Sequence, residues 1–207
     1  MHELTEAFFS SLYAPALAEP DLFEVAQVTL WTLPDKLSYH LPLKDLAAVA
    51  KKAIELDAEG KDVYFGVALR LPNLPQHQRG GKTELCAATA LWLDIDIADL
   101  KTHAHAAENL PIDVIEAHKI LDAVQVPPSA IIHSGHGVHA YWFLDDPHPL
   151  FESQQRGDFE AVMAALQHSA KRYADSCGWH LDLTVSADRV LRVPGTHNHK
   201  AKLMASA

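Results

Sequence analysis

Hydrophobic residues recur along the chain at two different spacings, and these spacings predict where its helices and strands lie. Apolar positions three and four residues apart are typical of a helix with one buried face. They predict four helices, at residues 4–12, 43–56, 112–124 and 159–173. The second of these ends before Gly60, and glycine is common directly after a helix end.

Alternating or continuous apolar runs predict the strands. The runs lie at residues 23–31, 63–69, 87–97, 131–143 and 181–185. The run at 131–143 contains a glycine-rich turn and therefore predicts a hairpin. Helices between strands, together with a hairpin, predict a mixed α/β (α+β) fold and argue against a purely parallel sheet.

Two carboxylates stand within the most apolar of these strands, Leu91–Ile97. Asp94 and Asp96 are two residues apart, so both side chains point to the same face of a strand. Their charges repel unless a cation lies between them or they share a proton. Oxygen ligands on a rigid strand suit a hard divalent ion such as Mg²⁺ or Mn²⁺. The structural alternative is a strand end where one Asp faces solvent and the other caps a loop.

The predicted hairpin brings small and basic residues to its turn. Ser134, Gly135 and Gly137 form the turn, and the two glycines permit a positive φ or a close backbone approach to a ligand. N–H groups in such a turn can bind an anion, and His139 on the return strand can donate a hydrogen bond to a phosphate. The alternative is a hairpin whose glycines only make the turn.

A third carboxylate and a group of hydrogen-bond donors follow near the end of the sequence. Leu181, Leu183 and Val185 alternate with polar residues, which predicts a short half-buried strand that carries Asp182. A Pro-Gly-Thr turn comes next. The donors around this turn suit phosphates; they are Arg192, Asn198, His199 and Lys200. A solvated basic loop is the alternative interpretation.

Together, these segments resemble the archaeo-eukaryotic primase superfamily, specifically its primase-polymerase branch of phage, plasmid and CRISPR-associated proteins. The D-x-D at Asp94, the S-G-x-G-x-H-x-Y-W run from Ser134 to Trp142 and the hydrophobic-Asp pair at Asp182 carry the resemblance. An R-x-P-G-T-x-N-x-K element follows at 192–200. With residues 62–68 and the Arg-Gly-Gly-Lys turn at 79–82, the similarity covers residues 60 to 200.

The resemblance implies a template-directed nucleotidyltransferase, a DNA primase or polymerase that extends a 3′-hydroxyl. In such an enzyme, Asp94, Asp96 and Asp182 hold two Mg²⁺ or Mn²⁺ ions, and His139 contacts the incoming triphosphate. NTPs or dNTPs are added on a single-stranded DNA template, with a helicase or accessory domain fused or acting in trans. The resemblance also implies residues that contact the nucleotide: Ser134, Gly135, Gly137, Arg192, Asn198, His199 and Lys200. It implies that Arg79 and Lys82 contact the template.

The resemblance also implies one catalytic domain over residues 1–207. An RRM-like catalytic lobe at 86–207 would pack against an N-terminal α/β lobe at 1–85. Relatives often continue into a helicase or another domain. A compact stand-alone member and a piece of a longer protein both fit the sequence.

Composition and charge narrow the class of protein further. Hydrophobic residues make up 48% of the 207, charged residues 21%, and no run approaches the ~18 apolar residues of a membrane helix. Two distant cysteines, Cys86 and Cys177, disfavour a disulfide framework and predict a reducing cytoplasm. The family resemblance implies that the protein is bacterial or is encoded by a phage or plasmid. The net charge of −10 predicts weak DNA binding through local basic patches.

Two other classes of protein fit parts of the sequence. A metal-dependent nuclease of the replication-initiator type would use paired histidines, at 103 and 105 or 197 and 199, with Tyr173 as nucleophile. A non-catalytic nucleotide- or RNA-binding module of RRM type would need exposed aromatics on its sheet, where this sequence predicts aspartates. Zinc content and a primer-extension assay distinguish these classes from a polymerase.

Overall fold

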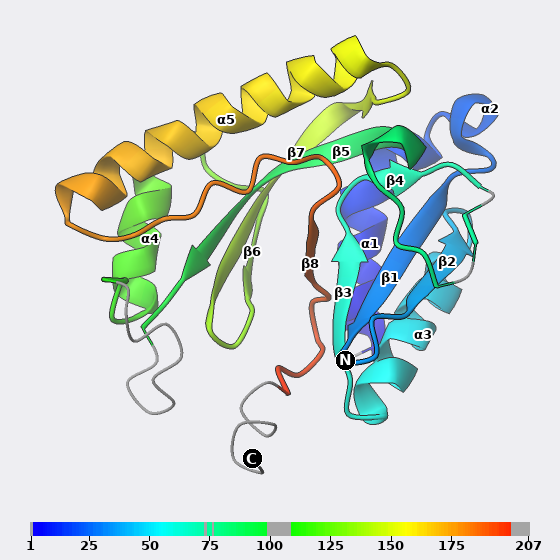
Figure 1. Cartoon of the computed structure of the whole chain (residues 1–207), viewed down its shortest axis with the longest axis horizontal. Coiled ribbons are helices and arrows are strands. Elements are labelled where there is room, and N and C mark those ends of the chain that lie inside the picture. Colours follow the sequence, from blue (N-terminus) through cyan, green and yellow to red (C-terminus); the bar gives the residue numbers. More distant parts are fainter. Residues whose placement is uncertain (1, 73, 76, 99–108, 200–207) are drawn as a thin grey trace. The chain divides into compact units, whose positions relative to one another are not determined.

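A computed structural model of the chain describes residues 2–72, 74–75, 77–98 and 109–199 (Figure 1). The helices are α1 (His2–Leu17), α2 (Pro20–Phe23), α3 (Leu46–Ala58), α4 (Val114–Asp122) and α5 (Ser153–Ser176), with a 3₁₀ turn at Lys82–Glu84. The strands are β1 (Gln27–Leu33), β2 (Ser38–Pro42), β3 (Asp62–Gly66), β4 (Leu69–Arg70), β5 (Leu85–Asp96), β6 (Ala130–His133), β7 (Gly137–Pro149) and β8 (Val190–Arg192).

The strands hydrogen-bond into one eight-stranded sheet. Its order is β6-β7-β5-β4-β1-β3-β8, and β2 pairs with β1 outside this path. Strand β1 is antiparallel to β2, β3 and β4, and the pairs β3–β8, β4–β5 and β6–β7 are antiparallel too. The predicted mixed α/β fold is therefore confirmed, and these six strand pairs are all antiparallel.

The chain divides into two compact units, and each is built from separate stretches of sequence. Unit 1 contains residues 1–90, 143–159 and 186–207, and unit 2 contains residues 91–142 and 160–185. Strands β5 and β7 each contribute residues to both units. The lobes expected at 1–85 and 86–207 stay a prediction.

In unit 1, helices α1 and α3 cover one face of strands β1 and β3 (Figure 1). Val28 and Leu30 of β1 are fully buried, and Phe65 of β3 packs its ring 5.7 Å from Phe8 and 5.3 Å from Phe9 of α1. Because side chains alternate along a strand, the residues between these point to the opposite face of the sheet. That second face is the one available for ligands.

In unit 2, strands β5 and β7 share a hydrophobic core with helices α4 and α5. Leu93 and Ile95 of β5 meet Val138, Ala140 and Trp142 of β7, which confirms the alternation expected for the return strand of the hairpin. The helices contribute Ala117, Ile120, Leu121, Ala170 and Ala174 to the same core. Burying this face of β5 leaves the side chains at 94 and 96 on the other face.

Three strand assignments differ from the structure, in addition to the strand predicted around Asp182. The first strand begins at Gln27 rather than at residue 23, because Pro20 opens the short helix α2. Strand β2 was not predicted; its sequence, Ser-Tyr-His-Leu-Pro, does not alternate clearly, and it pairs only with β1 in the described sheet. The three-residue strand β8 is too short to give a periodic signal.

None of the helices in the described part of the chain is long and apolar enough to cross a membrane. Helix α5 has 24 residues, but polar and charged side chains are spread along it. Both cysteines are free thiols, Cys86 buried and Cys177 exposed.

The surroundings of two glycines predict opposite effects of a Gly→Ala substitution on the free energy of unfolding. A Cβ at Gly137 would lie 2.3 Å from the Ile95 carbonyl oxygen, whereas a Cβ at Gly157 in α5 would meet nothing within 4 Å. We expect Gly137→Ala to lower the free energy of unfolding by about 1–3 kcal/mol or more, because the backbones of β5 and β7 must separate. Gly157→Ala should raise it by about 0.5–1 kcal/mol, as alanine favours a helix interior. Urea unfolding followed by circular dichroism measures both. Equal midpoints for the two variants would contradict this account of the hairpin.

Candidate functional site

Strand β5 holds Asp94 and Asp96 on one face, as the sequence predicts. The intervening Ile95 and the preceding Leu93 are buried in the core of unit 2, and both carboxylates are half-buried. Each carboxylate is therefore fixed by a strand whose other face is packed. This arrangement gives two oxygen donors on a rigid backbone.

His139 on the neighbouring strand β7 lies beside this pair. Its Nε2 is 3.4 Å from Oδ1 of Asp94, with the side chains 6% and 19% exposed, respectively. The other ring nitrogen, Nδ1, is buried and has no hydrogen-bond partner among the described residues. The His139 ring packs edge-on against Tyr141, with the ring centroids 6.4 Å apart. The ring is therefore held close to the carboxylates.

The hairpin turn has the geometry expected of its glycines. The Ser134 N–H donates to the Gly137 carbonyl at 2.9 Å, and Gly135 has a φ of 94°. Gly137 is required for a different reason: the backbone of β5 passes too close to it for a side chain. A cavity of about 350 Å³ lies beside the turn, lined by Ile97, Ala98, Asp113, Val114, His133, Gly135, His136 and Gly137.

The strand predicted around Asp182 is wrong, because residues 179–186 form no strand. Leu181 and Thr184 are buried, and the Leu183 side chain is exposed, so the burial does not alternate. Side chains bind the backbone here instead: the Thr184 carbonyl accepts from Trp92 Nε1, and its N–H donates to Gln167.

Asp182 itself presents an exposed carboxylate. Its side chain is 71% exposed, and Oδ1 is 2.9 Å from His180 Nε2. Asp94, Asp96 and Asp182 all belong to unit 2. In the part of the chain that the structure describes, however, these three do not form a group with all ligand atoms within 4.8 Å of one another. Their shared role as metal ligands stays a prediction.

In unit 1, the predicted phosphate-binding element is anchored by a buried ion pair. Arg192 Nη1 lies 2.8 Å from Oδ1 of Asp62, with side chains only 6% and 2% exposed. The same guanidinium donates to the His197 carbonyl at 2.7 Å and lies over the Tyr64 ring, 5.0 Å from its centroid. Arg192 therefore fixes the backbone of the element. Asn198 is half-buried, and Lys200 lies outside the described residues.

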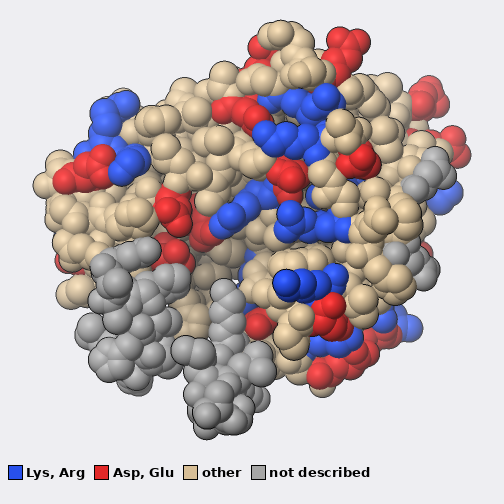
Figure 2. All heavy atoms as spheres, in the orientation of Figure 1, with Lys and Arg blue, Asp and Glu red and all other residues tan. Residues whose placement is uncertain are grey.

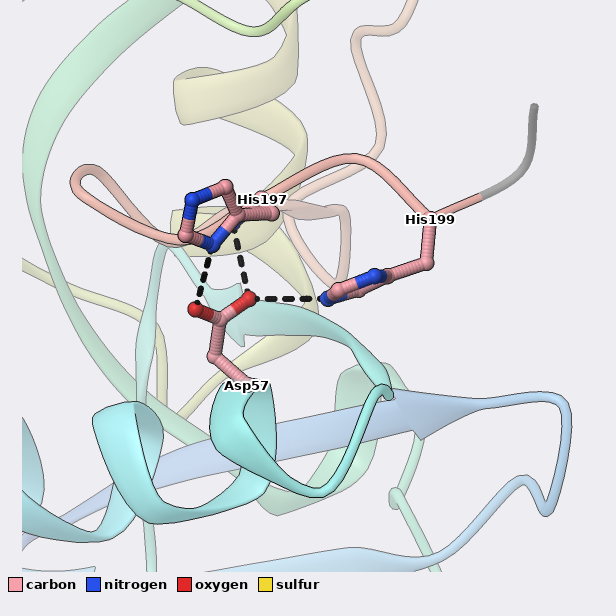
Figure 3. Close-up of side chains that lie close together, drawn as sticks. All are labelled: Asp57, His197 and His199. Atoms are coloured by element: carbon pink, nitrogen blue, oxygen red, sulfur yellow. Dashed lines mark hydrogen bonds and ion pairs between the residues drawn. The ribbon is translucent and has the colours of Figure 1, made fainter. Parts of the chain in front are cut away.

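A second acidic residue binds both histidines of this element (Figure 3). Asp57, in the last turn of α3, accepts from the ring of His197 at 2.8 Å and from that of His199 at 3.0 Å. The His197 backbone N–H donates to the same carboxylate at 2.8 Å. Burial acts to raise the pKa of Asp57, but these hydrogen bonds outweigh it and leave the pKa below its usual value of 3.8. Of the described residues, only these three form a group suited to hold a metal ion.

The sheet face of unit 1 opposite α1 and α3 carries aromatic rings. Trp31 of β1 is paired with Tyr64 of β3, with ring centroids 5.6 Å apart. The Arg79 guanidinium lies over the Trp31 ring, 5.4 Å from its centroid. A cavity of about 400 Å³ is lined by Trp31, Leu33, Tyr64, Arg79, Ser186, Asp188, Arg189 and Val190. In the view of Figure 2, basic and acidic side chains are interspersed over the surface.

Sequence reasoning missed the residues that depend on strand register or on long-range contacts. Trp31 and Tyr64 become neighbours only through the β1–β3 pairing. Asp57 and Asp62 lie more than 130 positions from the histidines that they bind. An acidic residue directly after the predicted helix at 43–56, where the helix dipole disfavours it, was a signal available for Asp57. Lys82 is exposed in the 3₁₀ turn, and Tyr173 packs against the core of unit 2.

Comparisons with known proteins find similarity in structure. No family model matches the chain, and no curated protein matches its sequence. The archaeo-eukaryotic primase (AEP) domain of the cyanophage S-2L primase-polymerase matches with a TM-score of 0.51 and 16% identity, over 91% of this chain and 84% of that one. The catalytic domain of primase RepB′, solved with initiator DNA, matches with a TM-score of 0.48 and 11% identity, over 96% and 80%. The polymerase domain of Mycobacterium tuberculosis ligase D, solved with DNA, matches with a TM-score of 0.44 and 13% identity, over 93% and 77%.

The first of these similarities confirms the fold that the sequence motifs implied. The chain has the AEP-type primase-polymerase fold. A fold of this kind hosts more than one activity, so the chemistry has to be argued from the side chains.

The hydrogen bonds to Asp57 predict a dependence of stability on pH. A carboxyl whose pKa is lower in the folded state stabilises that state above its unfolded pKa, and this contribution is lost as the pH falls through the folded value. We expect the wild-type free energy of unfolding to fall below pH 3.8, and to fall less steeply in Asp57→Asn. Hydrogen bonds to a buried charged group contribute about 1.5–3 kcal/mol, so Asp57→Asn should cost this much at pH 7.

Denaturant unfolding over a series of pH values measures this difference. Asp146→Asn, at an exposed position of β7, is the matched control and should follow the wild type. Identical pH profiles for Asp57→Asn and the wild type would show that the cluster contributes no pH-dependent stability.

Proposed function

We propose that this chain is a template-directed nucleotidyltransferase, a DNA primase or DNA polymerase that adds nucleotides to a 3′-hydroxyl. One observation carries the proposal: two carboxylates side by side on β5, with His139 of the neighbouring strand 3.4 Å from Asp94, in an AEP-type fold. Phosphoryl transfer needs mainly positioning and charge stabilisation from the protein. Rigid carboxylates beside a histidine can supply both.

Asp94 and Asp96 fit a hard divalent ion. Both are half-buried oxygen donors fixed by one strand, which is the ligand type that Mg²⁺ and Mn²⁺ prefer. Asp182, with an exposed carboxylate in the same unit, is the proposed third ligand. When bound, two such ions would activate the 3′-hydroxyl and stabilise the leaving pyrophosphate. The protein's own part is to hold these carboxylates in place.

His139 and the hairpin turn are proposed to bind the triphosphate. The buried ring of His139 is held beside Asp94, so its Nε2 faces the place where phosphates and cations would meet. Ser134 and Gly135 lie in the turn that precedes it, where backbone N–H groups suit an anion. Asn198 and Lys200 are further nucleotide contacts that we propose from the family resemblance. Arg192 donates to the His197 carbonyl and so holds the backbone that precedes Asn198.

The aromatic face of unit 1 is proposed to bind the single-stranded DNA template. Bases stack on aromatic side chains irrespective of sequence, and nearby arginines bind the phosphates. Trp31 and Tyr64 supply the rings, while Arg79 and the exposed Arg189 supply the charge around the same cavity. A local patch of this kind is needed because the chain as a whole carries a net charge of −10.

The carboxylates are tested by Asp94→Asn and Asp96→Asn. Each keeps the size of the side chain but removes a charge from the proposed metal site, so each should lower nucleotide incorporation roughly 10³-fold or more. The assay is primer synthesis and primer extension on single-stranded DNA with Mg²⁺ or Mn²⁺, with NTPs and dNTPs supplied separately.

Asp146→Asn, which removes an exposed carboxylate from β7, is the control and should keep full activity. Thermal unfolding verifies that each variant is folded. A wild-type chain that incorporates no nucleotide under any of these conditions, or a folded Asp94→Asn that works normally, would falsify the proposal.

The template surface predicts a shallow dependence of DNA binding on salt. Each phosphate contact on a single strand contributes a slope of about −0.7 to log affinity against log salt, and we expect about two to four contacts. Arg79→Ala should make the slope shallower by about 0.7. Trp31→Ala should leave the slope unchanged but weaken binding by about 1–3 kcal/mol, which is the contribution of one stacked base.

Fluorescence titration of labelled single-stranded DNA at several salt concentrations measures both quantities. Phe151→Ala is the control for Trp31, because Phe151 is an exposed aromatic residue of unit 1 outside this face. If Phe151→Ala weakens binding as much as Trp31→Ala, the DNA does not bind at the Trp31–Tyr64 face.

A further inference from the structure

The cluster of Asp57, His197 and His199 has the donor set of a transition-metal site. It offers one carboxylate and two imidazoles, and its three ligand atoms all lie within 4.8 Å of one another. Zn²⁺ is bound in proteins by such nitrogen and oxygen donors at about 2.0–2.2 Å. A tetrahedral ion at that distance would place its ligand atoms about 3.3 Å apart. The present separations of 2.8 and 3.0 Å between the ring nitrogens and the carboxylate are close to that value.

The backbone that carries the two histidines is fixed by contacts outside the cluster. The His199 N–H donates to Asp62 at 2.9 Å, and the His197 carbonyl accepts from Arg192 at 2.7 Å. The turn before them is closed by Thr196, whose hydroxyl donates to the Val193 carbonyl at 2.8 Å. The imidazoles can therefore shift by a few tenths of an ångström to take up an ion without rearranging the chain. A preformed frame of this kind lowers the cost of binding.

Electrostatics at this position favour a cation. Asp57 stands in the last turn of α3, where the helix dipole is negative and a carboxylate is disfavoured. Its side chain is 5% exposed, so solvent does little to offset the charge. The neighbouring Asp62 is neutralised by Arg192, whereas the Asp57 carboxylate is paired, in the described part of the chain, with the two imidazoles and the His197 backbone N–H. His197, 64% exposed, gives an ion a path from solvent.

We propose that Asp57, His197 and His199 bind one transition-metal ion of the zinc class. The site differs in chemistry from the carboxylate pair on β5, because imidazoles select zinc-like ions whereas carboxylates suit Mg²⁺ and Mn²⁺. The ion ties the end of α3 to the element at 192–199 and stabilises unit 1. It also occupies His199, which then does not contact a nucleotide. The inference goes beyond the proposed function and does not depend on it.

The experiment uses the full chain without an affinity tag, so that no added histidines compete. Asp94→Asn/Asp96→Asn serves as the background, because it removes two of the three carboxylates proposed to bind Mg²⁺ or Mn²⁺ and leaves only Asp182. Co²⁺ is titrated in and followed by its visible absorption, which is intense only in tetrahedral coordination, and Zn²⁺ is then added to displace it. We expect one Co²⁺ per chain, displacement by Zn²⁺, and a higher melting temperature with Zn²⁺ bound.

His197→Ala is the main variant, because its side chain is the most exposed of the three and its loss should not unfold the chain. Loss of a residue that only supports a ligand costs 10–100-fold in metal affinity, so loss of this ligand should cost roughly 100-fold or more. Asp57→Asn should do the same. His168→Ala, an exposed histidine on α5, is the matched control and should bind as the background does.

Each outcome decides the inference. Loss of the absorption and of the zinc-induced stabilisation in His197→Ala and Asp57→Asn, but not in His168→Ala, supports it. The inference is overturned if the background protein shows no tetrahedral Co²⁺, or if His197→Ala binds Co²⁺ as tightly as the background does. Asp57 then only accepts hydrogen bonds from the two histidines. Because the background lacks both β5 carboxylates, neither result bears on nucleotide incorporation.

Discussion

The buried ion pair of Asp62 and Arg192 is the contact on which the organisation of unit 1 depends. Taking two charges out of water is costly, and the cost is offset only when the remaining hydrogen-bonding groups also find partners. Here they do: Asp62 also accepts from the His199 N–H, and Arg192 also donates to the His197 carbonyl and to the Tyr64 hydroxyl. The pair joins the first residue of β3 to the last residue of β8. The path of the segment after β8 is set by this pair together with the hydrogen bonds of Asp57.

The two candidate cation sites described above differ in how their ligand atoms are positioned. On β5, the carboxylates are spaced along one strand, so their separation is set by the backbone and is already present in the sequence. Around Asp57, the donors come from a helix end and from a turn far along the chain, so their separation is set by tertiary contacts. The first arrangement is rigid and uses oxygen donors, and the second is adjustable and mixes nitrogen with oxygen. Their preferences for ions differ for that reason.

The same contrast explains how much could be predicted from the sequence. Periodicity located the four longer helices, the hairpin and the strand of Asp94, because these elements are long and bury one clear face, but it missed the four-residue helix α2. It placed a false strand at Asp182, where hydrogen bonds of the Thr184 backbone with Trp92 and Gln167 replace strand pairing. The paired ring of Tyr64 opposite Trp31, and Asp57 beside two histidines, could not be predicted, because they depend on register and on contacts across the fold. The residues of a site that are neighbours in the sequence can be predicted from it, whereas residues brought together by tertiary contacts cannot.

The interleaving of the two units has a consequence for how the protein is made on the ribosome. Unit 1 is begun by the first 90 residues, yet its strand β8 is not synthesised until residues 190–192. Until then, the edge of β3 that pairs with β8 through Tyr64 and Phe65 has no partner from its own chain. An unpaired strand edge is a template for association with other chains. The nascent polypeptide must therefore carry this exposed edge from the synthesis of β3 until β8 has been made, and its yield in a cell should depend on how well chaperones shield the edge.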